Sequence, residues 1–410
     1  VMDLLGVGAL GRVLMWWTRS LRRLAIPWFP RLAWVGASTG HSPPPLPPRL
    51  RQAATRLVCV DCHAGGEPAR VVIAGLPSVP GNTMREKRAA FMEEHDHIRE
   101  VLLLEPRGYP CQNANAVYKL SAPGEQPPRF GFIIMEQNKI YPMMSGHNTI
   151  CVATALLEMG LVPITGPVVN FTLEAPAGPI EIEATIDGGK AAQITFRNQP
   201  AFVAHLGVTV DLPLPPPMDK HLSLDIAYGG MWYAVVDAAS VGLELKPEHG
   251  KEICRLGELI KTAAREQHPV NHPEFDYPGC DILVFRGPAL PGSRSQGRNA
   301  VVMSNGVLDW ERPETWTGMI DRSPCGSGTC AVMAVLWAKG LLCVGDKFVH
   351  ESIVGSTFVG RVIGETQVAG RKAITTTISG SAWITQVCHV VVDPTDPFPK
   401  GFVVGDIWSG

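Results

Sequence analysis

The sequence predicts an α/β (α+β) protein built from two similar domains that are related by a pseudo-two-fold axis. The first observation is a long internal repeat, in which Met143–Val162 resembles Ser323–Leu342 at an offset of 180 positions. The second observation is that the resemblance continues between residues 168–186 and 346–363, at an offset of 177 positions. The third observation is that strand-like and helical stretches alternate in each half. A repeat this long has the size of a domain, whereas solenoid repeats recur about every 20–50 residues.

The composition is that of an ordinary soluble globular protein. Of its 410 residues, 45% are hydrophobic and 18% are charged. The formal net charge is only −2, which gives no general attraction to nucleic acid or to an anionic membrane. The ten cysteines fall mostly in apolar runs. This pattern predicts buried free thiols in a reducing compartment, so a cytoplasmic location is expected.

The first 56 residues differ from the rest of the chain. They contain eight arginines, no lysine and a single acidic residue, Asp3, together with the proline-rich stretch HSPPPLPPRLRQ. This composition is typical of an organellar targeting peptide, and the alternative is a disordered tail or an over-extended gene model. The stretch GVGALG at Gly6–Gly11 matches a dinucleotide fingerprint, but it lacks the preceding strand and the following acidic residue. A dinucleotide site is therefore rejected.

Strand-like and helical stretches follow one another from residue 57 onward. Two apolar runs around a glycine-rich turn predict a pair of strands over 56–75. Apolar residues at helical spacing predict a helix over 83–103. Further strands are predicted over 221–237, 280–287 and 371–393.

These elements divide the chain after the extension into two predicted domains. The first covers residues 57–195 and the second covers residues 196–374. The last strands are expected to return to the first domain, so that residues 375–410 complete it. Each domain contains one copy of the repeated unit, which consists of a turn, a buried helix and a β-hairpin.

The pair Cys59 and Cys62 forms a C-x-x-C motif, which invites a zinc or redox interpretation. It lies in an apolar, strand-like stretch and has no second cysteine or histidine pair nearby in the sequence. A structural role is therefore favoured, and no metal site is predicted.

The repeated turns are the best candidates for a functional site. Each turn leads into a helix that is apolar on nearly every side, and such a helix is buried. Its first amide groups lack partners within the helix and, together with the helix dipole, favour an anion. A pseudo-two-fold axis would bring both turns to one cleft between the domains, around a small carboxylate ligand. The turn residues are Ser145, Gly146, His147 and Asn148 in the first copy, and Cys325, Gly326, Ser327 and Gly328 in the second.

The thiol of Cys325 is the most reactive group in these turns. A helix N-terminus lowers the pKa of a cysteine, which makes the thiolate a usable base or nucleophile, whereas the hydroxyl of Ser145 is a much weaker base. No flavin, nicotinamide or metal signature occurs in the sequence, so chemistry without a cofactor is expected. The alternative is a duplicated domain in which small residues merely suit two tight helix entries.

Four motifs resemble the proline racemase family, which includes 4-hydroxyproline 2-epimerases and trans-3-hydroxy-L-proline dehydratases. They are DRSPCGSGT at 321–329, MSGHN at 144–148, DCHAGGEP at 61–68 and EPRG at 105–108. The resemblance runs from about Leu57 to the C-terminus. It implies the two-domain fold of diaminopimelate epimerase, cofactor-free proton abstraction at Cα, a proline-like substrate and a homodimer.

The resemblance also assigns roles to individual residues. It places Ser145 and Cys325 at the two acid/base sites. The backbone amides of four residues would bind the substrate carboxylate, namely Gly146, His147, Gly326 and Ser327. His147 and Asp321 would hold the ring amine.

One departure from the family pattern determines the expected reaction. Racemases and epimerases of the family carry cysteine at both sites, whereas dehydratases replace one cysteine by a hydroxyl residue, as Ser145 does here. The first hypothesis is therefore dehydration of trans-3-hydroxy-L-proline to Δ1-pyrroline-2-carboxylate. The alternatives are a 4-hydroxyproline 2-epimerase or proline racemase, and a silent binder of small amino acids. Which of Ser145 and Cys325 is the base stays open at this point.

Overall fold

The structure is a computed structural model, and it describes residues 47–48, 55–121, 129–212, 221–280, 282–304 and 306–408. Residues 52–410 form one compact unit. Nearly all of the N-terminal extension, with its predicted disorder or targeting role, lies outside the described residues. Within the described part of the chain, no helix combines the length and the hydropathy needed to cross a bilayer.

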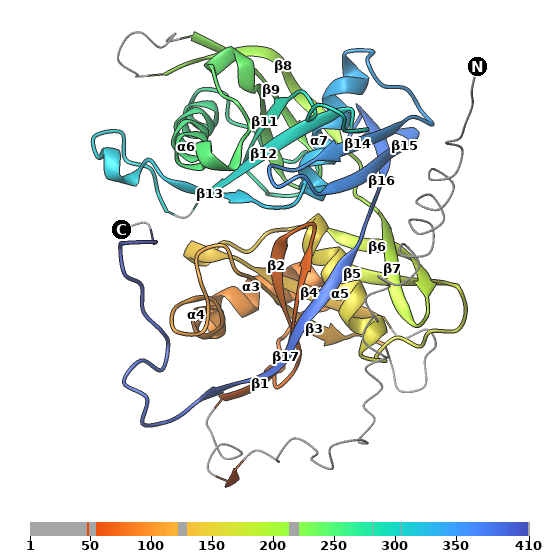
Figure 1. Ribbon diagram of the computed structural model, residues 1–410, viewed down its shortest axis with the longest axis vertical. Coiled ribbons are helices and arrows are strands. Elements are labelled where there is room, and N and C mark those ends of the chain that lie inside the picture. Colours follow the sequence, from red (N-terminus) through yellow and green to blue (C-terminus); the bar gives the residue numbers. More distant parts are fainter. Residues whose placement is uncertain are drawn as a thin grey trace, which may run out of the picture. The chain divides into compact units, whose positions relative to one another are not determined.

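The strands form two lobes, which are the lower and upper parts of Figure 1. The N lobe consists of the described residues within 55–197 and 382–408, and the C lobe of those within 202–380. The strands of the N lobe are β1 (Thr55–Ala64), β2 (Glu67–Ala74), β3 (Asn113–Lys119), β4 (Phe130–Met135), β5 (Val168–Ala175), β6 (Gly178–Asp187), β7 (Lys190–Arg197) and β17 (Ala382–Val392). Its helices are α3 (Met84–Glu94), α4 (Asp96–Leu103), η1 (Gln137–Lys139) and α5 (Gly146–Glu158).

The C lobe repeats this arrangement. Its strands are β8 (Phe202–Asp211), β9 (His221–Tyr228), β10 (Trp232–Asp237), β11 (Ile282–Gly287), β12 (Gly297–Ser304), β13 (Gly318–Asp321), β14 (Lys347–Glu351), β15 (Thr357–Val368) and β16 (Arg371–Gly380). Its helices are η2 (Ala238–Val241), η3 (Pro247–His249), α6 (Gly250–Gln267), η4 (Pro313–Thr315) and α7 (Gly326–Ala338). The predicted helix over 83–103 is thus two helices, α3 and α4, which His95 separates.

Strand pairing follows the same pattern in both lobes. The order is β17-β1-β2-β3-β4-β5-β6-β7 in the N lobe and β8-β9-β10-β11-β12-β14-β15-β16 in the C lobe. Parallel and antiparallel pairs occur at the same places in both orders. The parallel pairs are β2-β3 and β4-β5 in the N lobe, and β10-β11 and β12-β14 in the C lobe. The internal repeat of the sequence is therefore a repeat of topology.

The last strand of each half of the chain pairs with a strand of the other half. β8 follows β7 of the N lobe but pairs with β9 of the C lobe, and β17 follows β16 of the C lobe but pairs with β1. Figure 1 shows β17 running down from the C lobe along the N lobe. An antiparallel pair between β7 and β16 also joins the two lobes. The exact boundaries of two folding domains stay a prediction.

The two helices of the repeat are buried at the centre of their lobes. α5 packs against β1, β2, β3, β7 and β17, and α7 packs against β8, β9, β10, β15 and β16. Nearly every residue of both helices is buried, which agrees with their apolar character on every side. Their side chains share one hydrophobic core that includes Ile150 and Phe196 of the N lobe and Met333 and Phe358 of the C lobe.

Smaller cores lie on the outer sides of the lobes. One contains α6 and the neighbouring strands of the C lobe, and the other contains α3, α4 and strands β1, β2 and β3 of the N lobe. The central core therefore fixes the two helix N-termini, while the outer cores hold the strands around them.

The first residues of α5 and α7 touch each other across the two lobes. A Cβ atom built on Gly146 would lie 2.5 Å from the Cα atom of Gly326, and one built on Gly326 would lie 2.8 Å from the Cα atom of Gly146. These contacts are to backbone, which cannot rotate away as a side chain can. Only glycine fits at either position.

We predict that Gly146→Ala destabilises the protein, by about 2 kcal/mol or more, because the added methyl group separates the two backbones. Gly250→Ala is the matched control, because Gly250 also begins a helix and its Cβ would only make an ordinary contact of 3.7 Å with Ile320. This control should be neutral or slightly stabilising. Urea unfolding of the three proteins measures the difference. Equal stability of Gly146→Ala and wild type would show that the helix ends do not need this contact.

Candidate active site

The residues before the two glycines present their side chains at the junction of the lobes. Ser145 precedes α5 in an extended conformation, with φ −148°. Cys325 precedes α7 with φ +56°, in the left-handed region that favours glycine. Neither side chain caps its own helix, so both remain available for other partners. Strained backbone of this kind costs about 1–3 kcal/mol and often marks a functional site.

A short hydrogen-bonded chain holds the unusual conformation of Cys325. The amide of Cys325 donates to Ser323 Oγ at 3.1 Å, and the amide of Ser323 donates to Asp321 Oδ1 at 2.7 Å. Asn299 Nδ2 donates to the carbonyl oxygen of Pro324 at 2.7 Å. These bonds fix the turn from both sides and offset the backbone strain.

Ser145 lies in a chain of polar side chains within the N lobe. Asn115 Nδ2 donates to Asn148 Oδ1 at 2.6 Å, and Asn148 Nδ2 donates to Ser145 Oγ at 3.0 Å. Ser145 Oγ also lies 3.3 Å from His147 Nδ1. Which of these two atoms donates depends on the imidazole tautomer, because a hydroxyl oxygen that accepts from Asn148 can accept a second hydrogen bond.

His147 is neutral at ordinary pH. Burial lowers its pKa to about 3, because the interior disfavours the charged imidazolium. Its Nε2 atom is buried without a hydrogen-bond partner among the described residues. Unpaired buried polar atoms are uncommon, so this nitrogen is available to a ligand.

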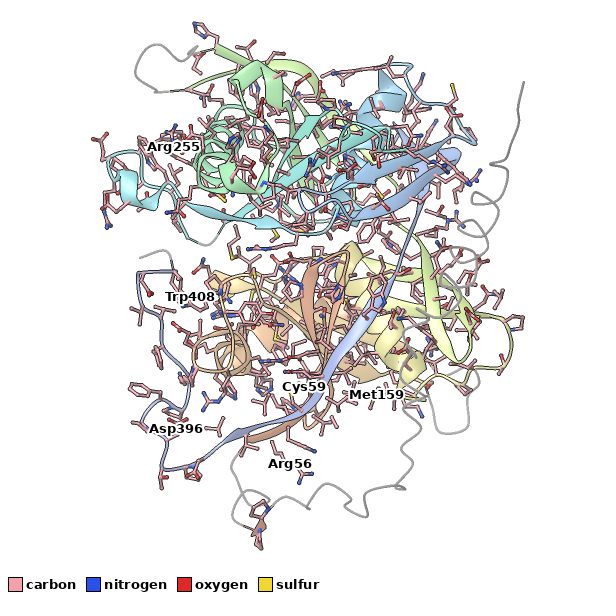
Figure 2. All side chains as sticks on the ribbon, in the orientation of Figure 1. Arg56, Cys59, Met159, Arg255, Asp396 and Trp408 are labelled. Atoms are coloured by element: carbon pink, nitrogen blue, oxygen red, sulfur yellow. The ribbon has the colours of Figure 1, made fainter. Side chains whose placement is uncertain are left out.

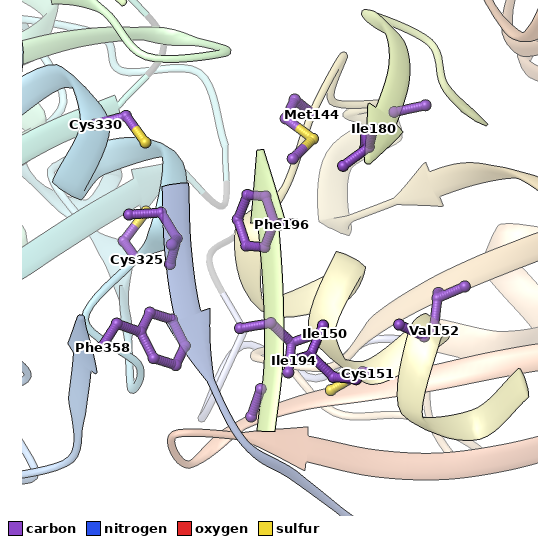
Figure 3. Close-up of a cluster of buried hydrophobic side chains, with 14 of the residues drawn as sticks. Met144, Ile150, Cys151, Val152, Ile180, Ile194, Phe196, Cys325, Cys330 and Phe358 are labelled. Atoms are coloured by element: carbon purple, nitrogen blue, oxygen red, sulfur yellow. The ribbon is translucent and has the colours of Figure 1, made fainter. Parts of the chain in front are cut away.

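Cys325 has hydroxyl partners from its own helix and from β10. Tyr233 Oη lies 3.5 Å from Cys325 Sγ and 2.6 Å from Ser327 Oγ, and Ser327 Oγ lies 3.9 Å from the same sulfur. Gly328 leaves room for this arrangement, because a Cβ there would lie 3.1 Å from Cys325 Sγ. Figure 3 shows Cys325 and Phe196 in the hydrophobic core that the two lobes share.

The prediction that the helix dipole lowers the Cys325 pKa is wrong. Burial raises the pKa of this thiol above its ordinary value, and the nearby carboxylate of Asp321 raises it further. Desolvation of the thiolate outweighs the hydrogen bonds from Tyr233, Gly328 and Ser327, which act in the opposite direction. Only 6% of Cys325 and 7% of Ser145 is exposed, so solvent contributes little to either residue.

A buried acidic pair joins the lobes beside Cys325. Asp321 of the C lobe has its pKa raised to about 6 by burial. Glu67 of the N lobe accepts hydrogen bonds from the Arg322 amide at 2.7 Å and from Asn113 Nδ2 at 3.0 Å. Burial and the charge of Asp321 raise the pKa of Glu67 well above its usual range. This contact positions the Asp321 turn against the N lobe.

The structure brings the predicted residues into one place, but sequence reasoning missed several neighbours. The helix ends carrying Gly146 and Gly326 touch, and Ser145 and Cys325 directly precede them. Asn148 lies in the predicted turn and Glu67 lies in the DCHAGGEP motif, but neither was assigned a role. Tyr233 lay in an apolar strand that gave no signal. Among the described residues, no group of three or more metal-ligating side chains is placed to hold a metal ion.

The comparisons with known proteins agree with this geometry. The family model of proline racemase matches residues 59–403. The chain is 37% identical over 346 residues to a 4-hydroxyproline 2-epimerase of Streptosporangium roseum, covering 84% of this chain and 97% of that protein. It is 36% identical over 347 residues to a proline racemase of Clostridioides difficile, with coverage of 84% and 97%. The chain belongs to the proline racemase family.

A solved structure supports the fold of this family member. A hydroxyproline epimerase from Agrobacterium vitis, with bound trans-4-hydroxy-L-proline, matches with a TM-score of 0.76 and 31% sequence identity. The match covers 87% of this chain and 98% of that chain. The predicted α+β fold with two similar halves is thereby confirmed. The homodimer and the cytoplasmic location stay predictions.

Two cysteines of the same turn and helix allow a direct test of the site. We predict that Cys325→Ala abolishes turnover and leaves the fold intact, because the family resemblance places this thiol at an acid/base site. Cys330 is fully buried in α7 and accepts a hydrogen bond from Thr376 Oγ1 at 3.1 Å. Cys330→Ala should therefore cost about 1 kcal/mol of stability and retain activity. Turnover and melting temperature of both variants measure the difference. Wild-type activity in Cys325→Ala would refute the assignment.

Proposed function

We propose that this family member dehydrates trans-3-hydroxy-L-proline to Δ1-pyrroline-2-carboxylate without a cofactor. The observation that carries the proposal is the unequal pair at the touching helix ends, a hydroxyl at Ser145 and a thiol at Cys325. A matched pair of thiols suits a reaction that takes a proton from one face of Cα and returns one to the other. The unequal pair suits a reaction that needs one strong acid/base group.

Substrate binding follows from the two helix N-termini. Their first amides and their dipoles favour an anion, and two such ends converge on one point. The substrate carboxylate would accept hydrogen bonds from the amides of Gly146, His147, Gly326 and Ser327. These same donors would stabilise the negative charge that spreads onto the carboxylate after the α-proton leaves. The carboxylate of Asp321 would hold the positive ring amine, and Nε2 of His147 provides a further polar contact.

The stereochemistry of the substrate explains why one group is sufficient. In trans-3-hydroxy-L-proline, the α-hydrogen and the 3-hydroxyl lie on the same face of the ring. The Cys325 thiolate on that face takes the α-proton, and the C–H electron pair moves onto Cα and the carboxylate. The C3–O bond then breaks, and the new thiol gives its proton to the departing hydroxyl, which leaves as water. The enamine tautomerises to the Δ1 imine, and the thiolate is restored.

The surroundings of the two residues favour these roles. Burial that raises the pKa of Cys325 makes its thiolate a stronger base once it has formed. The Ser145 hydroxyl lies within hydrogen-bond distance of Asn148 Nδ2 and His147 Nδ1, and an alcohol is a poor proton donor compared with a thiol. Return of a proton from the Ser145 side, which epimerisation requires, is therefore slow.

We predict that the purified protein converts trans-3-hydroxy-L-proline to a product that lacks one water, which mass spectrometry detects directly. Ser145→Cys should add epimerase activity on 4-hydroxyproline, because it restores a thiol on the second face. Cys325→Ala is the control for background reaction. Absence of the pyrroline product with the wild-type protein would refute dehydration. Failure of Ser145→Cys to gain epimerase activity would show that this position does not set the reaction type.

The second candidate function is 4-hydroxyproline 2-epimerase, or proline racemase. It is favoured by the names of the relatives, which include an epimerase at 37% identity, and by the epimerase structure with bound trans-4-hydroxy-L-proline. In this case Ser145 would be the second proton donor. Reaction in D2O separates the candidates, because epimerisation yields product that is labelled at Cα and inverted, whereas dehydration yields no inverted amino acid.

A silent binder of small amino acids is the third candidate. Alkylation of Cys325 does not separate this candidate from an enzyme, because burial raises the pKa of the thiol and any bound ligand shields it. Turnover does separate them. A silent binder would bind hydroxyproline but form no product from any proline derivative, whereas product formation that Cys325→Ala abolishes would exclude this candidate.

A further inference from the structure

Tyr233 is a buried hydroxyl next to the proposed reactive sulfur, and the reaction described above gives it no role. It lies in β10 and is fully buried, and its hydroxyl is within hydrogen-bond distance of both Ser327 Oγ and Cys325 Sγ. Its ring packs on Gly328, since a Cβ atom built on this glycine would lie 3.3 Å from Tyr233 Cε1. The hydroxyl is thus held rigidly at the sulfur by a side chain that comes from a different element.

The charge state of Tyr233 decides the direction of its hydrogen bond. Burial raises the pKa of the phenol well above its ordinary value, and the neighbouring Cys325 raises it further. Tyr233 therefore keeps its proton and donates. While Cys325 is a thiol, the shorter bond to Ser327 is the better one. A thiolate is a much stronger acceptor than a neutral hydroxyl, so the donor turns toward the sulfur once the sulfur is charged.

We propose that Tyr233 is a positioning residue for Cys325, and that its hydroxyl, shared with Ser327, holds and stabilises the sulfur when it carries negative charge. This inference rests on the proposed role of Cys325 in catalysis. The groups that act on the sulfur are Asp321, which disfavours the thiolate, and Tyr233, Ser327 and the Gly328 amide, which favour it. Tyr233 is the donor among them that comes from outside the turn and α7.

Tyr233→Phe tests the inference, because it removes one oxygen and keeps the ring that packs on Gly328. The matched control is Tyr228→Phe in β9. Tyr228 is also buried, and its hydroxyl has no hydrogen-bond partner among the described residues. Both variants lose one buried phenolic hydroxyl, but only the first loses a donor to the sulfur.

The measurement is the pH dependence of Cys325 alkylation by iodoacetamide, followed in the peptide that contains Cys325. We expect Tyr233→Phe to slow alkylation about tenfold at a fixed pH below the thiol pKa, which is the effect of losing one hydrogen bond to a charged group. The same variant should lower kcat about tenfold with little change in KM. Tyr228→Phe should follow the wild-type curve.

Different results would overturn the inference about Tyr233 and the proposed reaction. Alkylation needs no turnover, so a shifted curve supports Tyr233 even if the substrate is a different amino acid. Wild-type alkylation at every pH in Tyr233→Phe would overturn the inference while the proposed reaction stands. An equal shift in Tyr228→Phe would also overturn it, because the effect would then arise from the general loss of a buried hydroxyl.

A second inference concerns the C-x-x-C motif and is independent of the reaction. Cys59 and Cys62 do not face each other. Cys59 in β1 lies directly opposite Cys388 in β17, and each thiol shifts the pKa of the other. Cys62 instead neighbours Cys151 of α5, whose pKa it raises. Figure 2 shows Cys59 beside the β17 strand.

The Cys59–Cys388 pair has the geometry and the chemistry of a disulfide site. Directly opposed residues of an antiparallel pair have Cα atoms about 4.5–5.5 Å apart, which lies in the range that a disulfide spans. Cys59 is buried, but Cys388 is half-buried and reachable. The neighbouring Cys59 thiol lowers the pKa of Cys388 to about 7, and the positive charge of Arg70 acts in the same direction, whereas burial and Asp61 oppose it. Cys388 is therefore the more reactive thiol.

We infer that Cys59 and Cys388 form a reversible disulfide that links β1 to β17 under oxidation by a peroxide. The Cys388 thiolate attacks one oxygen of hydrogen peroxide, which gives a sulfenic acid and hydroxide. The Cys59 thiol then displaces that oxygen, and the S–S bond forms. Overall, two thiols and one hydrogen peroxide give one disulfide and two waters.

Treatment of the reduced protein with hydrogen peroxide, followed by peptide mass mapping, tests this inference. We expect a linked peptide pair that contains Cys59 and Cys388 and that dithiothreitol releases. Cys388→Ser should abolish the link, whereas Cys343→Ser, which removes an exposed cysteine, should retain it. Complete absence of the link in the folded protein, or a link between Cys62 and Cys151 in its place, would overturn the inference.

Discussion

The contact between the Gly146 and Gly326 backbones is the constraint on which the rest of the site depends. Two helix N-termini repel each other, since each carries partial positive charge, so their approach needs support from elsewhere. The shared hydrophobic core around α5 and α7 provides that support. The arrangement brings the positive ends of two helix dipoles to one point, which favours an anion there. The contact that joins the lobes is thus also the basis of the proposed carboxylate site.

The two-fold symmetry of the backbone makes the chemical asymmetry of the site meaningful. The lobes share their strand order, their exchanged strands and their buried helices, but the residues at the helix entries differ. Ser145 belongs to an amide and imidazole chain, whereas Cys325 belongs to a hydroxyl cluster beside a buried acid. Duplication provides matched positions at the two helix entries. In the proposed reaction, the difference between the two groups determines whether a proton is returned to the opposite face of the substrate carbon.

Much of this arrangement could be predicted from the sequence, because the repeat is local. The offset between Ser145 and Cys325 identified the paired turns, and the apolar helices behind them predicted burial. The predictions failed where packing between distant segments decides the outcome. The Cys325 pKa depends on burial and on Asp321, which outweigh the helix dipole. The positions of Tyr233 and Glu67 follow from strand pairing and lobe contact, which residue spacing does not contain.

A crystal structure of the protein with trans-4-hydroxy-L-proline tests the central claim most directly. The account predicts that the carboxylate lies on the amides that begin α5 and α7, and that the ring Cα lies between Ser145 and Cys325. A separate cavity of 1020 Å³ lies elsewhere on the chain, and its lining includes Arg255, Arg312 and Arg322. Binding of the amino acid there, with the two helix ends unoccupied, would contradict the account.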